Sequence, residues 1–189
     1  MSRARALTLA LATGLAVVPF APALADLDWF QHPFGERRAY VQDWLAVCAD
    51  SGAGPCRLVR SNQDSRGPAF DSRVSLHLAP GGWTMEVMDR GMPSETLSEL
   101  RFFFDETLLI VATRQDFIPG ERDFPNILET VTLTNPDLTD RLLSAMRAGG
   151  ELVITYRPEG SGDATVIIPL RGVTAGLDAL TQIETERQP

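Results

Sequence analysis

The stretch Arg73–Val87 reads RVSLHLAPGGWTMEV, and its alternation of apolar and polar residues decides the fold class. In Arg73–Leu78 the even-numbered residues are apolar, and in Trp83–Val87 the odd-numbered residues are. A period of two is typical of a β-strand with one buried face. Ala79–Gly82 lies between the halves, contains Pro and Gly, and predicts a turn, so the whole stretch is expected to form a β-hairpin.

One register of this hairpin buries a whole face. Pairing across the four-residue turn brings together Leu78 with Trp83, Leu76 with Met85, and Val74 with Val87. The same register places His77 opposite Thr84 on the polar face. We interpret His77 as a surface residue of a solvated sheet face rather than as a catalytic group.

Strand signals continue on both sides of the hairpin, so the protein is expected to be mainly β. Further strands are predicted at Tyr40–Cys48, Cys56–Ser61, Leu100–Phe104, Leu108–Ala112, Leu128–Thr134, Leu152–Tyr156 and Thr165–Leu170. The consecutive apolar residues of Phe102–Phe104 predict a strand covered on both faces, and core packing is favoured over an aromatic ligand groove. Asp105–Glu106 predicts a short turn, and Gln115–Asn126 predicts a loop.

The C-terminal third also carries the signals of helices. Asn135 is a good N-cap, Pro136 suits the first helical position, and apolar residues then recur on one helical face until Gly149 ends the segment. The sequence therefore predicts a short amphipathic helix packed on a sheet. A second helix is expected within Val173–Ile183.

Cys48 and Cys56 enclose a short loop between two predicted strands. Opposed residues of antiparallel strands lie at separations that a disulfide can span. In an oxidising compartment we expect this bond, which would constrain the unfolded chain by roughly 2.5 kcal/mol. A reactive thiol or a zinc site is disfavoured, because His32 and His77 lie at no spacing typical of such sites.

The N-terminal residues 1–25 have the three zones of a secretory signal peptide. Arg3 and Arg5 give a positive start, an apolar stretch follows, and small residues at the end predict cleavage after Ala25. The apolar stretch is shorter than the roughly 20 residues of a membrane-spanning helix and is broken by proline. We therefore expect the mature chain, 26–189, to work outside the cytoplasm.

Charge and composition exclude several function classes. The chain has a formal net charge of −8, which becomes −10 when Arg3 and Arg5 leave with the signal peptide. An acidic chain is a poor partner for nucleic acid or anionic membranes. It contains no lysine, which rules out P-loop, Schiff-base and Ser-Lys chemistry. The length of the mature chain suits one domain.

Both ends of the mature chain resemble the invasion-associated locus B family. Trp44–Cys48 (WLAVC), a short Gly/Pro loop and Cys56–Leu58 (CRL) are similar to the opening of that domain. Met146–Gly149 (MRAG), Ile168–Gly172 (IPLRG) and Gly176–Leu180 (GLDAL) are similar to its closing pattern in order and spacing. Family members tend to carry a second cysteine pair before the helix, which this chain lacks, so it resembles a divergent member with one pair.

This resemblance implies an immunoglobulin-like antiparallel β-sandwich with one or two short helices near the C-terminus. It also implies a bacterial protein that is periplasmic or secreted, and whose partner is an envelope or host protein. The family has no established catalytic residue. The sequence accordingly assigns no catalytic, cofactor-binding or metal-binding residue, and it makes no prediction of oligomeric state.

The segment Asp89–Glu95 (DRGMPSE) is a possible binding loop. It follows a predicted strand, contains a Gly/Pro turn and carries both charges, with Arg90, Met92 and Glu95 as the candidate contact residues. Met92 is expected to be exposed. Loops on rigid scaffolds often carry binding function, although an ordinary connection between strands is the simpler interpretation.

Three functions remain compatible with the residues. The preferred one is a non-catalytic envelope protein that binds a protein partner or stabilises the cell surface. The second is a glycan or small-molecule binding module that uses exposed aromatic residues such as Trp29, Phe30 and Trp83. The third is a carboxylate-based hydrolase, which would require two carboxyl groups converging in a cleft, at least one of them with a raised pKa.

Overall fold

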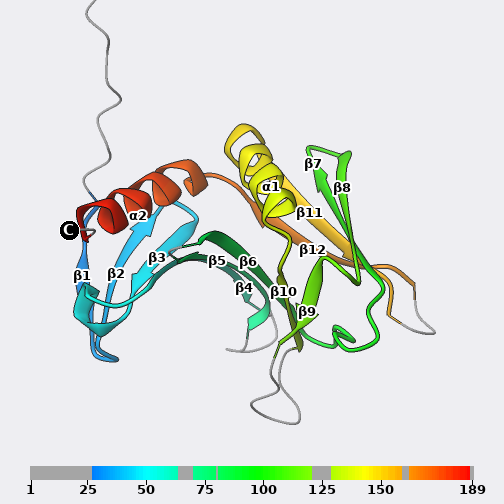
Figure 1. Ribbon diagram of the computed structural model, residues 1–189, viewed down its shortest axis with the longest axis horizontal. Coiled ribbons are helices and arrows are strands. Elements are labelled where there is room, and N and C mark those ends of the chain that lie inside the picture. Colours follow the sequence, from blue (N-terminus) through cyan, green and yellow to red (C-terminus); the bar gives the residue numbers. More distant parts are fainter. Residues whose placement is uncertain (1–26, 64–69, 80, 121–128, 159–161, 188–189) are drawn as a thin grey trace, which may run out of the picture.

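The computed structural model describes residues 27–63, 70–79, 81–120, 129–158 and 162–187. It contains two antiparallel β-sheets and two α-helices (Figure 1). The predicted mainly β class and the two-sheet architecture are therefore confirmed. The predicted signal peptide and its cleavage site after Ala25 lie outside the described residues.

The larger sheet, sheet A, has eight strands in the order β1-β2-β3-β4-β5-β6-β10-β9. Its strands are β1 (Phe30–His32), β2 (Glu36–Val41), β3 (Trp44–Cys48), β4 (Cys56–Gln63), β5 (Phe70–Ala79), β6 (Gly82–Asp89), β9 (Phe117–Pro119) and β10 (Glu129–Leu133), with a short 3₁₀ helix, η1 (Asp50–Gly52), between β3 and β4. The first six strands follow chain order, so each one pairs with its neighbour in sequence.

The smaller sheet, sheet B, has four strands in the order β12-β11-β7-β8. Its strands are β7 (Glu99–Phe104), β8 (Thr107–Thr113), β11 (Glu151–Tyr156) and β12 (Ala164–Pro169), and the helices are α1 (Pro136–Ala148) and α2 (Val173–Arg187). Within the described part of the chain, neither helix is long and apolar enough to cross a membrane.

The β5–β6 hairpin, from which the mainly β class was predicted, has the predicted register. Leu78 pairs with Trp83 and Leu76 with Met85, and His77 lies opposite Thr84. The turn is tighter than expected, because Ala79 and Gly82 are also paired. Gly82 has a φ of +110°, a conformation that costs a glycine little and favours a short connection.

The Cys48–Cys56 disulfide is present, as predicted. The two cysteines are directly opposed partners of β3 and β4, with Cα atoms 4.1 Å apart. Both side chains are buried in the core. The bond therefore fixes the pairing of these two strands at the end where η1 connects them.

Helix α1 begins and ends where the capping residues indicate. The Asn135 side-chain oxygen accepts a hydrogen bond from the Leu138 N–H at 3.2 Å, Pro136 is the first helical residue, and Gly149 follows the last. This cap satisfies a backbone donor that the helix itself leaves unpaired. The second predicted helix is also present, and α2 extends beyond Ile183 to Arg187.

Three segments differ from the sequence predictions. The strand expected at Tyr40–Cys48 is divided into β2 and β3 by a turn at Gln42, whose φ is +56°. The loop expected at Gln115–Asn126 contains the short strand β9, and its residues 121–126 lie outside the described part of the chain. Phe102–Phe104 is not covered on both faces: Phe102 and Phe104 are buried, whereas Phe103 is partly exposed, because only one face of sheet B meets the core.

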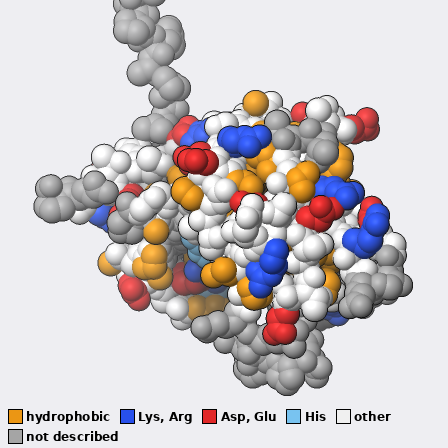
Figure 2. Space-filling view, turned by 45° about the vertical axis from the view of Figure 1, so that its right-hand side comes forward, with side chains coloured by type: hydrophobic (Ala, Val, Ile, Leu, Met, Phe, Trp, Pro, Cys, Tyr) orange, Lys and Arg blue, Asp and Glu red, His pale blue; other side chains and the backbone are white. Residues whose placement is uncertain are grey.

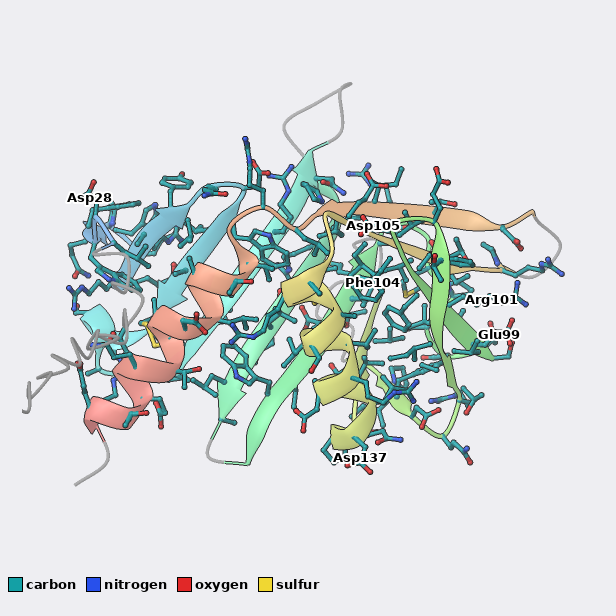
Figure 3. The ribbon with its side chains drawn as sticks, turned by 90° about the horizontal axis from the view of Figure 1, so that it is seen from above. Asp28, Glu99, Arg101, Phe104, Asp105 and Asp137 are labelled. Atoms are coloured by element: carbon teal, nitrogen blue, oxygen red, sulfur yellow. A yellow bond between two sulfur atoms is a disulfide. The ribbon has the colours of Figure 1, made fainter. Side chains whose placement is uncertain are left out.

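The hydrophobic core joins sheet A, both helices and the inner face of sheet B. Figures 1 and 3 show both helices on the same side of sheet A, where α2 contacts β2, β3 and β4 and α1 contacts β6. Leu58 of β4 and Leu177 of α2 are fully buried there. Gly176 allows this close packing, since a Cβ atom at that position would lie 2.6 Å from a Leu58 methyl group.

The end of β12 and the segment between β12 and α2 are bonded to the β2–β3 hairpin. The Trp44 indole N–H donates to the Pro169 carbonyl at 3.1 Å, and Arg171 forms a two-point ion pair with Asp43 at 2.7 and 3.1 Å. Gly172, with a φ of +95°, approaches Val41 so closely that a Cβ would lie 2.2 Å from the Val41 carbonyl oxygen. The β2–β3 turn and the start of α2 therefore form one packed unit.

Candidate functional site

Sheet A has one face against the helices and one face turned away from them. In Figure 1 the sheet arches beneath the helices, so the face turned away is concave, and we call it the concave face. The strand registers define two rows of side chains across it. One row is Phe30, Arg38, Val47, Arg57, His77 and Thr84, and the other is Tyr40, Leu45, Val59, Ser75, Glu86, Thr132 and Ile118.

An aromatic cluster lies at the β1–β2 end of the concave face. Tyr40 is 71% exposed and its ring stacks with that of Phe30, with centroids 6.0 Å apart. Phe34, in the β1–β2 turn, is 81% exposed and lies beneath the Arg38 guanidinium at 5.9 Å. His32 packs edge-on against Phe34. Exposed aromatic rings beside arginine are the side chains most enriched in protein interfaces.

An ionic network occupies the centre of the same face. Glu36 accepts hydrogen bonds from Arg38 and, at 2.9 Å, from Arg57. The bond from Arg38 is the main reason that the pKa of Glu36 is held below its usual value. Arg73 pairs with Glu86 at 2.9 Å. Among the side chains that the structure describes there, three arginines and two glutamates give this face a small positive excess on a chain that is acidic as a whole.

His77 lies within this network, on the sheet face turned away from the core as the sequence predicted, and it is half-buried there rather than fully exposed. Its cross-strand neighbours are Arg57 and Thr84. Burial is the main cause of its lowered pKa, and the charges of Arg57 and Arg73 act in the same direction against an opposing effect of Glu86. The lowered pKa favours the neutral imidazole, and among the described residues no carboxylate is hydrogen-bonded to it to form a catalytic dyad.

A small polar pocket opens at one end of sheet B, where β7 begins and β11 ends. Its volume is about 140 Å³, which is below the roughly 300 Å³ at which small-molecule sites begin. Four charged residues line it, and they are already paired: Arg101 with Glu99 at 2.5 Å, which Figure 3 shows side by side, and Arg157 with Asp163 at 2.7 Å. Arg157 holds the pKa of Asp163 below its usual value.

The predicted binding loop is only partly available for contact. Arg90 and Glu95 are exposed, but Met92 is fully buried, so the expectation that Met92 is exposed was wrong. The Met92 N–H donates to the Asp89 carbonyl and closes a tight turn, which directs the methionine side chain into the core. None of these three candidate residues lines the polar pocket.

The aromatic residues suggested for glycan binding also separate into two groups. Trp29 and Trp83 are partly buried and pack against the core, whereas Phe30 is exposed on the concave face. The sequence analysis missed Phe34 and Tyr40. The alternation of Tyr40 with buried neighbours in β2 was the signal available for it, but it was read as part of one long strand.

The described carboxyl groups with a shifted pKa all have lowered values. They are Glu36, Asp43, Asp116 and Asp163, and in each the first cause is a hydrogen bond from a side chain. A carboxyl group that donates a proton near neutral pH needs a raised pKa, so none of these four suits that role. The described residues also contain no group of three or more His, Cys, Asp or Glu side chains placed to hold a metal ion.

On the side of the molecule shown in Figure 2, acidic and basic side chains are interspersed with apolar ones. No extended basic stripe of the kind that follows a nucleic-acid backbone is visible on that side.

No known family model and no curated protein matches the sequence. Among solved structures, the chain is similar to that of invasion associated protein B from Bartonella henselae, with a TM-score of 0.56. The two chains share a fold. Their sequences are 17% identical over 78% of this chain and 98% of the other, so the likeness concerns the architecture and does not extend to individual residues. It agrees with the fold that the sequence resemblance implied.

Proposed function

We propose that the mature chain is an exported, non-catalytic envelope protein that binds a protein partner through the concave face of sheet A. One observation carries this proposal. Within the described residues six large apolar side chains are exposed, and three of them, Phe30, Phe34 and Tyr40, lie together at the β1–β2 end of this face. A fourth, Ile118, lies on the same face at its opposite end. Clustered apolar exposure on one face is typical of an interaction surface.

The chemistry of the face fits a protein better than a small ligand. An aromatic cluster lies beside an ionic network, which gives an apolar contact area together with charges that select a partner. The slight positive excess, on an otherwise acidic chain, favours a partner segment that carries acidic residues.

An extracytoplasmic location is compatible with two further features. The Cys48–Cys56 disulfide suits an oxidising compartment. The chain also shares its fold with an invasion-associated protein. These features agree with the secretory signal that the N-terminal sequence predicts.

A glycan-binding module is the second candidate, and the exposed rings of Phe34 and Tyr40 favour it. Sugars stack on exposed aromatic faces through their apolar C–H groups. A screen of envelope sugars for a shift in the melting temperature separates the two candidates, because only the glycan function predicts a shift that Tyr40→Ala abolishes.

The proposal can be tested by photo-cross-linking in cells that export the chain. A photoreactive amino acid at position 34 or 40 is expected to capture one and the same protein. The matched control is position 167, since Ile167 is also half-exposed and lies on the outer face of sheet B. Equal capture from position 167 would contradict the proposal.

Binding measurements with the purified partner complete the test. Tyr40→Ala or Phe34→Ala is expected to weaken binding by roughly tenfold or more, as for aromatic residues central to an interface. Ile167→Ala is expected to leave the affinity unchanged. If the aromatic variants bind as tightly as the natural chain, the concave face is not the binding surface.

A further inference from the structure

The two sheets have four edge strands, and three of them are protected against pairing with another chain. Strand β1 has three residues, and β9 has three and ends at Pro119. The carbonyl oxygens of β12 accept hydrogen bonds from side chains of sheet A: Ile167 from Asn62 at 2.8 Å and Pro169 from Trp44 at 3.1 Å. Short edges, proline and covered edges are the usual protection against edge-to-edge association.

The fourth edge, β8, is protected less fully: helix α1 contacts the strand, and Asp116 bonds to the backbone of its last residue, Thr113. It is seven residues long and reads TLLIVAT, with no charge, no proline and no glycine. Among the described residues it pairs with β7 alone. A long, uncharged and β-branched edge strand is a template for strand addition.

Thr113 shows which backbone groups of β8 point away from β7, although its own two groups are already bonded to Asp116. Its N–H donates to the Asp116 carboxylate at 2.8 Å, and its carbonyl accepts from the Asp116 N–H at 2.8 Å. These bonds are made on the side away from β7. Because N–H and C=O groups alternate in direction along a strand, those of Val111 point to the same free edge. The Val111 side chain is itself 41% exposed.

We propose that the free edge of β8 pairs antiparallel with β8 of a second copy of this chain, which joins the two copies of sheet B into one continuous sheet. The charges at the ends of the strand favour a second copy as the occupant. Glu106 precedes β8 and Arg114 follows it, and both are exposed. Antiparallel pairing of two identical strands brings Glu106 of each copy towards Arg114 of the other.

The residues between Glu106 and Arg114 carry no charge. Two acidic chains can therefore pair along β8 without bringing like charges together. Two-fold pairing of this kind also forms a closed dimer rather than a fibre. The dimer would present two concave faces in one particle, and a partner with repeated sites would then be bound with higher avidity.

Charge reversal gives a sharp test. In sedimentation equilibrium of the mature, oxidised protein we expect a concentration-dependent dimer. Glu106→Arg alone and Arg114→Glu alone should each weaken it by about tenfold, because each variant places like charges opposite one another. The double variant should restore the affinity. The two residues lie about 25 Å apart within one chain, beyond the range of screened interactions, so restoration requires contact between chains.

A backbone variant tests the strand pairing itself. Val111→Pro removes the outward N–H without removing a bond to β7 and should abolish the dimer, whereas Val111→Thr keeps the N–H and should retain it. Circular dichroism and melting temperature establish that each variant is folded, a check that also covers the bond from Arg114 to the Phe117 carbonyl. A chain that stays monomeric up to about 1 mM, or a double variant that fails to recover, would overturn the proposal. A folded Val111→Pro variant that still dimerises would also overturn it.

Discussion

The close packing of α2 on sheet A predicts that Gly176→Ala destabilises the natural chain but stabilises a chain in which Leu58 is already replaced by alanine. Gly176 lies in the first turns of α2, where alanine alone would stabilise the helix by about 1 kcal/mol relative to glycine. In this structure, however, the added Cβ would lie 2.6 and 2.8 Å from the two methyl groups of Leu58. Leu58 is fully buried and cannot turn both methyl groups away at once.

The magnitudes follow from these two opposing effects. Overpacking a core costs about 1–3 kcal/mol, so Gly176→Ala in the natural chain should lower the free energy of unfolding by about 1 kcal/mol after the gain in helix propensity. Leu58→Ala alone leaves a cavity and should cost about 2–5 kcal/mol. In that background Gly176→Ala should instead raise the free energy of unfolding by about 1 kcal/mol or more, because the new methyl group enters the cavity.

Urea unfolding followed by tryptophan fluorescence measures all four proteins, with the disulfide intact. The expected coupling between the two positions is about 2 kcal/mol. An effect of Gly176→Ala that is the same in both backgrounds would refute the close contact of α2 with β4, whatever its sign. A stabilising effect in the natural chain would refute it as well.

Three further predictions concern the turns and cross-links. Replacing Cys48 and Cys56 together by alanine should lower the free energy of unfolding by about 2.5 kcal/mol in urea, and a loss smaller than about 1 kcal/mol would mean that the unfolded variant keeps the β3–β4 loop closed without the bond. Gly172→Ala should cost at least about 2 kcal/mol in the same assay, because an alanine is strained at a φ of +95° and meets the Val41 carbonyl; a neutral effect would contradict this packing. Asp116 has a folded pKa below its unfolded value of 3.8, so its contribution to stability is present above that value and is lost as the pH falls through the folded pKa. The stability difference between the natural chain and Asp116→Asn should therefore shrink in acid, and a difference that is independent of pH would show that the carboxylate charge is not responsible.

Local sequence patterns were sufficient wherever neighbouring residues determine the structure. The register between Leu76 and Met85 follows from burying one face of a hairpin, because a slip of one residue would expose every apolar side chain. The start of α1 follows from Asn135 and Pro136, whose effect on the backbone acts within one turn. The cysteine pair belongs to the same class, since its two strands are adjacent in sequence.

The errors arose where distant contacts decide the outcome. Gln42 turns the chain without a glycine or proline, and its turn is packed against Gly172 near the other end of the sequence. Met92 was expected to be exposed because it lies in a loop of polar residues, but the tight turn at Asp89 directs it into the core. Neither contact leaves a periodic signal in the local sequence.

The candidate site was missed for a related reason. Phe34, Tyr40 and Ile118 come from opposite ends of sheet A and share a face only after the sheet has formed. The sequence analysis instead favoured a single loop, because a loop is contiguous in the chain. A surface assembled across eight strands is visible only once the register of every strand is known.

Helix α2 and the segment before it pack on strands from the first third of the chain, and this contact limits when the chain can complete its folding during synthesis and export. The Trp44–Pro169 hydrogen bond joins residues 125 positions apart, and α2, at the C-terminal end, covers β3 and β4. Closing such long loops is slow compared with forming hairpins. The early hairpins can form as the chain emerges, but Leu58 and its neighbours stay uncovered until α2 arrives. We therefore expect folding to be completed only after the last helix is delivered, and the waiting sheet to depend on holding chaperones until then.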